Sequence, residues 1–86
     1  MKSKQVLANI QKKEVIMLPL TMANPGEPVT IKKIGGKAET KKFLETLGFV
    51  VGGVVTVVSE ISGNMIVNVK DSRVAIGKDM ANKIMV

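Results

Sequence analysis

The second half of the chain alternates between apolar and polar positions as half-buried strands do. Over residues 65–70 every second side chain is apolar, which predicts a strand with one buried face. Residues 54–61 carry β-branched side chains on both faces, so this strand is expected to be buried on both sides for part of its length. Shorter strands are predicted at residues 29–34, 73–76 and 84–86, and a hairpin turn at Ser62-Gly63-Asn64.

One helix is predicted, over residues 37–47. Its apolar side chains follow the i, i+3, i+4 spacing and share one face, which is formed by Phe43, Leu44 and Leu47. Gly48 is placed to take the left-handed conformation just past the helix end, and Phe49 would then pack on Leu44 as in a Schellman cap. A helix this short is not stable alone, so it needs a sheet beneath it. Both phenylalanines are therefore expected to be buried.

These elements predict a mainly β fold of about five short strands with one inserted short α-helix, plus a single helical turn at residues 78–83 that would bury Met80 or Ala81. A sheet this small has long unpaired edges, which curling into a barrel removes. We therefore expect a small, partly open β-barrel over residues 17–86. Residues 1–16 are expected to be an N-terminal extension. We interpret it as a tail or an appended edge element rather than a membrane-surface helix, because its apolar stripe is narrow.

The composition excludes whole classes of chemistry. The 86 residues include no Cys and no His, which excludes disulfides, thiolate zinc sites and imidazole bases or metal ligands. Gly36-Lys37 and Gly77-Lys78 lack the upstream Gly and the following Ser or Thr of a phosphate-binding loop. The longest uncharged run has 14 residues, 46–59, whereas a spanning helix needs roughly 20. We expect a cytoplasmic protein that is not an enzyme and has no cofactor, no metal site and no small-molecule substrate.

Basic residues are in excess, because 13 Lys and Arg against 7 Asp and Glu give a net charge of +6. Five lysines lie close together in the sequence, around the predicted start of the helix: Lys32, Lys33, Lys37, Lys41 and Lys42. Such a patch could contact phosphate. Two features argue against nucleic acid: the two aromatic residues are expected to be buried, which leaves no platform for stacking bases, and lysine lacks the bidentate fork that reads bases. A solvated helix face explains the lysines as well.

Four short motifs follow one another along residues 18–86: Pro25-Gly26-Glu27, Leu44-Glu45-Thr46-Leu47-Gly48-Phe49, Val74-Ala75-Ile76-Gly77 and Ile84-Met85-Val86. Their order resembles the FeoA family, small cytosolic proteins of bacterial ferrous iron transport. The resemblance implies a barrel like that of Src-homology-3 (SH3) domains with an extra helix, and no agreed catalytic residues. It also implies a regulator that acts on the cytosolic, GTPase-bearing part of the membrane iron transporter FeoB. The membrane would then be reached only through this partner.

A docking protein needs a contact surface, and the sequence offers two. One is the set of five lysines. The other is the set of apolar residues that a small core cannot cover: Leu18, Leu20, Met22, Val50, Val51 and Met85. Core packing or weak self-association would account for the same apolar residues. The stretch from Gly26 to Lys37 also resembles the barrel motif of ribosomal and transcription-factor domains. A basic barrel that binds RNA or ribosomes is therefore the second hypothesis, although the helix after Lys37 favours the first.

Overall fold

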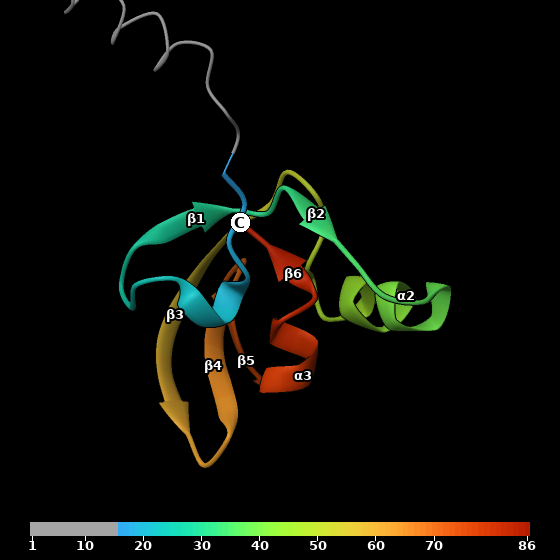
Figure 1. The fold of residues 1–86 in the computed structure, drawn as a ribbon. Coiled ribbons are helices and arrows are strands. Elements are labelled where there is room, and N and C mark those ends of the chain that lie inside the picture. Colours follow the sequence, from blue (N-terminus) through green and yellow to red (C-terminus); the bar gives the residue numbers. More distant parts are fainter. Residues whose placement is uncertain (1–15) are drawn as a thin grey trace, which may run out of the picture.

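The larger sheet forms one side of the molecule. The computed structural model describes residues 16–86. Four antiparallel strands pair in the order β1-β3-β4-β5, and β3 is the longest of them (Figure 1). Their bounds are β1 Pro28–Thr30, β3 Val54–Ile61, β4 Asn64–Val69 and β5 Ser72–Gly77. The mainly β fold with short strands and one inserted helix agrees with the prediction.

A second, smaller sheet forms where the two ends of the described chain meet. Strand β2 (Lys33–Ile34) pairs with β6 (Ile84–Met85) in antiparallel register. On the other side of β6, Leu18 and Val86 exchange backbone hydrogen bonds of 2.9 and 2.8 Å, and Pro19 bridges Met85. Residues 18 and 19 therefore form a third, short segment at the edge of this sheet. The predicted last strand is confirmed as β6.

The predicted strand at residues 29–34 is divided into β1 and β2, which belong to different sheets. The break lies at Ile31, where the N–H donates to the Gly53 carbonyl oxygen at 2.9 Å and the carbonyl accepts from the Gly52 N–H at 2.8 Å. Next along the chain, the Lys32 N–H donates to Met85 at 2.7 Å. The chain bends here from one sheet into the other. The break in alternation at Lys33-Ile34 predicts a bend two residues further along the chain.

Helix α2 (Ala38–Thr46) follows β2 and ends as the sequence predicts. Gly48 has φ +103°, its N–H donates to Glu45 at 2.9 Å, and the Phe49 N–H donates to Leu44 at 2.9 Å. These two bonds are those of a Schellman cap. Two shorter helices complete the fold: the 3₁₀ turn η1 (Leu20–Met22) and α3 (Lys78–Ala81), which buries Ala81 fully and Met80 only in part.

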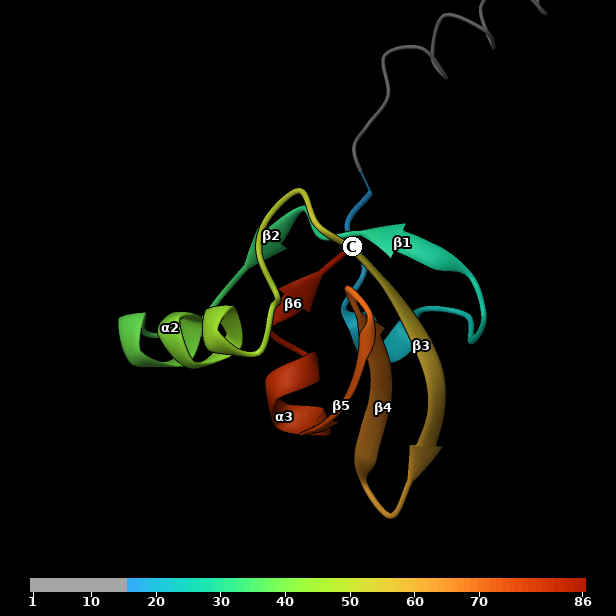
Figure 2. The ribbon, with the colours of Figure 1, turned by 180° about the vertical axis from the view of Figure 1, so that it is seen from behind.

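The β3–β4 hairpin extends away from the smaller sheet, as both ribbon views show (Figures 1 and 2). Its turn residues Ser62 and Gly63 have φ of +49° and +81°, the positive values that tight hairpins favour. The alternation predicted for β4 is confirmed, because Met65, Val67 and Val69 are all buried. Strand β3 differs from the prediction: only one of its faces is fully buried, and Val54 is 57% exposed.

The hydrophobic core lies between the two sheets and under the end of α2. Its largest fully buried side chains are Phe49, Leu20, Ile31, Leu44, Met65, Ile84, Val55 and Val67. Each such side chain contributes about 1.5–3 kcal/mol relative to exposure. Phe49 is buried as predicted, but the predicted burial of Phe43 is wrong, since that side chain is 48% exposed. No helix within residues 16–86 combines the length and the apolarity that crossing a bilayer requires.

Candidate docking surfaces

Helix α2 projects sideways from the barrel, a feature that both ribbon views share (Figures 1 and 2). Leu44 anchors it as the one fully buried side chain of the helix. Thr40 and Leu47 are half-buried, while the remaining side chains of α2 are exposed. The helix is therefore held to the barrel along a narrow line and leaves most of its circumference to solvent.

Phe43 lies beside this line of attachment rather than in it. Successive helical residues turn by about 100°, so Phe43 is displaced by that angle from Leu44, toward the side of Thr40 and Leu47. The apolar face predicted from the sequence is thus wider than the surface that the barrel covers. Polar neighbours flank the ring one turn away on either side, at Glu39 and Thr46, and the Thr46 hydroxyl donates to the Phe43 carbonyl oxygen at 2.5 Å.

Three lysines gather where α2, β2 and β6 meet. Lys37 is the N-cap of α2, and Lys33 pairs with Met85 on the face of the smaller sheet opposite the buried Ile34 and Ile84. Lys83 shares that face, since its carbonyl accepts from Gly35 at 2.7 Å.

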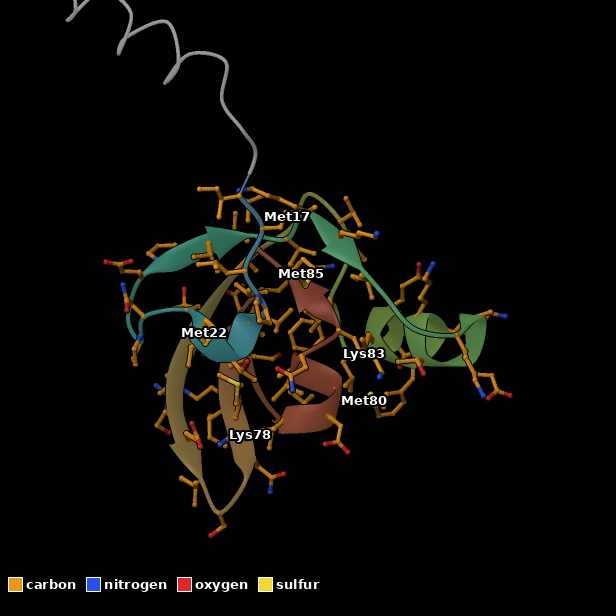
Figure 3. All side chains as sticks on the ribbon, in the orientation of Figure 1. Met17, Met22, Lys78, Met80, Lys83 and Met85 are labelled. Carbon is orange, nitrogen blue, oxygen red and sulfur yellow. The ribbon has the colours of Figure 1, made fainter. Side chains whose placement is uncertain are left out.

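The aliphatic stem of Lys83 reaches toward the start of α2. A Cβ built on Gly36 would lie 3.0 Å from Lys83 Cδ, and Figure 3 shows Lys83 beside α2. Lys83 was not among the predicted lysines. Met85 is the central residue of the last predicted strand, and Lys83 lies two positions before it. This spacing puts both side chains on one face of a strand and could have predicted the position of Lys83.

The five predicted lysines do not form one patch. Lys41 and Lys42 are successive residues of α2 and point about 100° apart around it, and Lys32 lies at the bend between β1 and β2. All five are exposed. The structure therefore brings together Lys33, Lys37 and the unpredicted Lys83, and separates the other three.

The predicted apolar residues are also divided. Leu20 is not a surface residue: it is 0% exposed, because η1 turns the chain after Pro19 and directs this side chain into the core. Met22 is 64% exposed and lies on η1, apart from Met17 (Figure 3). Met85 is half-buried on the outer face of β6.

The three remaining predicted apolar residues gather at one end of the molecule. We define the apolar rim as the exposed side chains of Ile16, Met17, Leu18, Val50 and Val51. Two strands separate its two halves: Leu18 bonds to Val86 at the end of β6, β6 pairs with β2, and the bend at Ile31 before β2 bonds to the loop that carries Val51. In both ribbon views the segment entering at residue 16 and the loop before β3 lie at the same end as the C-terminus (Figures 1 and 2).

The described residues contain little that could perform chemistry. Within residues 16–86 no three His, Cys, Asp or Glu side chains lie close enough to hold a metal ion. The same part of the chain has no detectable pocket. Its ion pair joins Glu60 Oε2 to Lys78 Nζ at 2.5 Å, with both side chains about half exposed. The candidate functional features of the described residues are therefore their exposed apolar and basic side chains.

Comparison with known proteins decides the family. The model of the FeoA domain matches residues 18–86. The chain belongs to the FeoA family. A relative from Methanocaldococcus jannaschii, named "Putative Fe(2+) transport protein A", is 37% identical over 70 residues, which cover 81% of this chain and 85% of the relative.

Solved structures of FeoA proteins confirm the predicted fold class. The crystal structure of an iron uptake regulatory protein, FeoA, superimposes with a TM-score of 0.76 at 29% identity and covers 84% of this chain and 96% of that one. An FeoA-like protein from Clostridium acetobutylicum gives 0.74 at 12% identity, covering 84% and 86%. A manganese-dependent transcriptional repressor gives 0.76 at 18% identity over 86% of this chain and 42% of the repressor. The last two similarities concern the fold alone.

Proposed function

We propose that this FeoA-family chain is a non-enzymatic, cytoplasmic accessory protein of ferrous iron transport. It docks on the cytosolic, GTPase-bearing part of the membrane transporter FeoB. The family and the Fe(2+)-transport name of the 37% identical relative support the transport role. The partner comes from the resemblance to the family, and the structure contributes a surface that suits it.

The observation that carries the proposal is the half-exposed Phe43 on the projecting helix α2. A phenylalanine left in water forgoes part of the free energy that burial would supply, and aromatic side chains are enriched at the centres of protein interfaces. Because Leu44 and the cap at Gly48 fix the helix, the ring is presented on a rigid support. A groove on the partner could bury this ring with little loss of conformational entropy, because the helix is already ordered.

Lysines on other sides of the same helix suit a partner that carries carboxylates. Lys42 lies about 100° around α2 from Phe43, and Lys37 is at the start of the helix. Charges at the rim of an interface speed association and fix orientation more than they add affinity. Any regulation of transport would follow from a preference for one conformational state of the partner.

A binding titration against the purified cytosolic part of FeoB tests the proposal. We expect saturable binding in at least one of the GTP-analogue, GDP and nucleotide-free states. Phe43→Ser should weaken it by about tenfold or more, as removal of a central aromatic does. Ile61→Ser is the matched control, because Ile61 is 57% exposed on the distant β3–β4 hairpin. No binding in any state, or equal effects of the two substitutions, would contradict the proposal.

RNA binding is the second candidate, and two observations favour it. The objection that both aromatics are buried no longer holds, since Phe43 is exposed. Lys33, Lys37 and Lys83 also gather at one junction. A single ring is a small platform for bases. Retention on RNA that falls steeply with salt and is lost in Phe43→Ser would support this candidate over FeoB docking.

A further inference from the structure

We propose that Lys83 is a pre-positioned contact for a carboxylate of the docking partner and that it acts beside Phe43. Together the two residues select a partner segment in which an apolar side chain and a carboxylate are neighbours. This inference rests on the proposed docking through α2 and deepens it, because it names the chemistry that the surface recognises. The lysine concerned lies outside the five that the sequence singled out.

Lys83 differs from the other basic residues that the structure describes. Its side chain is half-buried, whereas every other lysine of residues 16–86, and also Arg73, is exposed. A long cationic side chain loses conformational entropy when it is held in one place. In Lys83 part of that entropy is already lost on folding, so less remains to be lost when an anion binds.

The backbone of Lys83 is fixed on two sides. Its N–H donates to the Met80 carbonyl oxygen of α3 at 3.0 Å, and its carbonyl oxygen accepts from the Gly35 N–H at 2.7 Å. The residue therefore ties the end of α3 to the segment that leads from β2 into α2. The base of its side chain has little freedom as a result.

Gly36 provides the space through which the stem of Lys83 passes. A Cβ atom on this glycine would lie 3.0 Å from Lys83 Cδ and 3.4 Å from both Cβ and Cγ2 of Thr40. The stem therefore runs beside Thr40 in the first turn of α2, where Figure 3 shows Lys83 next to the helix. Any side chain at position 36 would crowd it.

Phe43 lies on the same side of the helix. Thr40 and Phe43 are three residues apart, so their Cβ atoms are separated by about 5–6 Å. Glu39 lies about 40° around α2 from Phe43, on the side away from Thr40. The surface therefore places a cation on one side of the aromatic ring and a carboxylate on the other.

Lys83 forms no ion pair within residues 16–86, where the ion pair joins Glu60 to Lys78. A carboxylate suits its ammonium group, because the two form a strong charge-assisted hydrogen bond. The half-exposed ring of Phe43 would meanwhile bury an apolar side chain next to that carboxylate. A protein segment suits this pair better than nucleic acid, since a single ring gives bases little to stack on.

Binding of the purified cytosolic part of FeoB to full-chain variants tests the proposal. Lys83→Met removes the charge and keeps the stem, so it should weaken binding by about tenfold and reduce its dependence on salt. Lys42→Met is the matched control, because it removes the same charge from α2 at about 100° around the helix from Phe43. It should weaken binding by less than about threefold. Equal effects of the two substitutions would overturn the proposal and leave docking through Phe43 intact.

A second pair of variants tests the position of the charge rather than its presence. Gly36→Ala keeps every lysine but places a Cβ where the Lys83 stem passes, so it should also weaken binding. Gly26→Ala is the control, since Gly26 has a similar φ of +86° and no atom within 4 Å of the added Cβ. If the two glycine variants bind FeoB equally well, the position of Lys83 does not matter and the proposal is overturned.

A peptide titration separates this inference from the identity of the partner. The probes are acetyl-Leu-Ala-Glu-amide and the same peptide with Gln in place of Glu, followed through the amide chemical shifts of the full chain. If FeoB binds in no nucleotide state, the proposed function fails, but the Glu peptide should still shift the amides of both Lys83 and Phe43. The Gln peptide should leave Lys83 unchanged. Equal shifts of Lys83 with the two peptides, or none with either, would then overturn the inference as well.

Discussion

Gly48 packs so closely on Val69 that a Cβ atom on the glycine would lie 2.8 Å from Val69 Cγ1. This contact joins the end of α2 to the end of β4. Gly48 also has φ +103°, a conformation that other residues adopt only at a cost. One glycine thus closes the helix and allows its close approach to the sheet.

Substitution of Gly48 by alanine is therefore expected to be costly for two reasons. The backbone conformation costs about 1–2 kcal/mol, and crowding against Val69 adds about 1–3 kcal/mol. Gly52→Ala is the matched control, because Gly52 has φ +90° but no atom within 4 Å of the added Cβ. Urea unfolding should show a clearly larger loss for Gly48→Ala. Equal losses would mean that the contact with Val69 is relaxed at no cost.

Truncation of the two phenylalanines should destabilise the fold to very different degrees. Phe49 is fully buried, so Phe49→Ala should lower the free energy of unfolding by about 3–5 kcal/mol. Phe43→Ala should lower it by less than about 1 kcal/mol, because nearly half of that side chain is already in water. Thermal or urea unfolding of both variants measures this difference. A large loss from Phe43→Ala would show that the ring supports the fold rather than being available to a partner.

The ion pair between Glu60 and Lys78 should contribute little to stability. Both side chains are about half exposed. Exposed ion pairs contribute about 0–1 kcal/mol to the free energy of unfolding, even when the distance between their charged atoms is short. Glu60→Gln should therefore change the free energy of unfolding by less than about 1 kcal/mol, and the difference should shrink as salt is added. A loss that is large, or that persists in high salt, would contradict this account.

Regular local patterns in the sequence were enough to predict much of the fold. The alternation at Met65, Val67 and Val69 fixed which face of β4 is buried, and the spacing of Leu44, Gly48 and Phe49 predicted the Schellman cap. The division of the first strand at Ile31 was not predicted at the right place, because it depends on backbone bonds to Gly52 and Gly53, which are distant in sequence.

The candidate surfaces were harder to predict, because exposure depends on how elements dock. Helical spacing grouped Phe43 with Leu44, but the barrel covers only a narrow line of α2. Leu20 was expected at the surface and is buried, because the turn at η1 reverses its direction. Lys83 lies near Lys33 and Lys37 only because β2 pairs with β6, and this pairing was not evident from the sequence.

The central claim is that α2 presents the surface that docks on the cytosolic part of FeoB. The most direct test is to map the amide chemical shifts of the full chain while that part of the transporter is added. The account predicts that the largest changes fall on α2 around Phe43 and on the adjoining residues Lys37 and Lys83. Changes confined to the β3–β4 hairpin, or no changes in any nucleotide state, would contradict it.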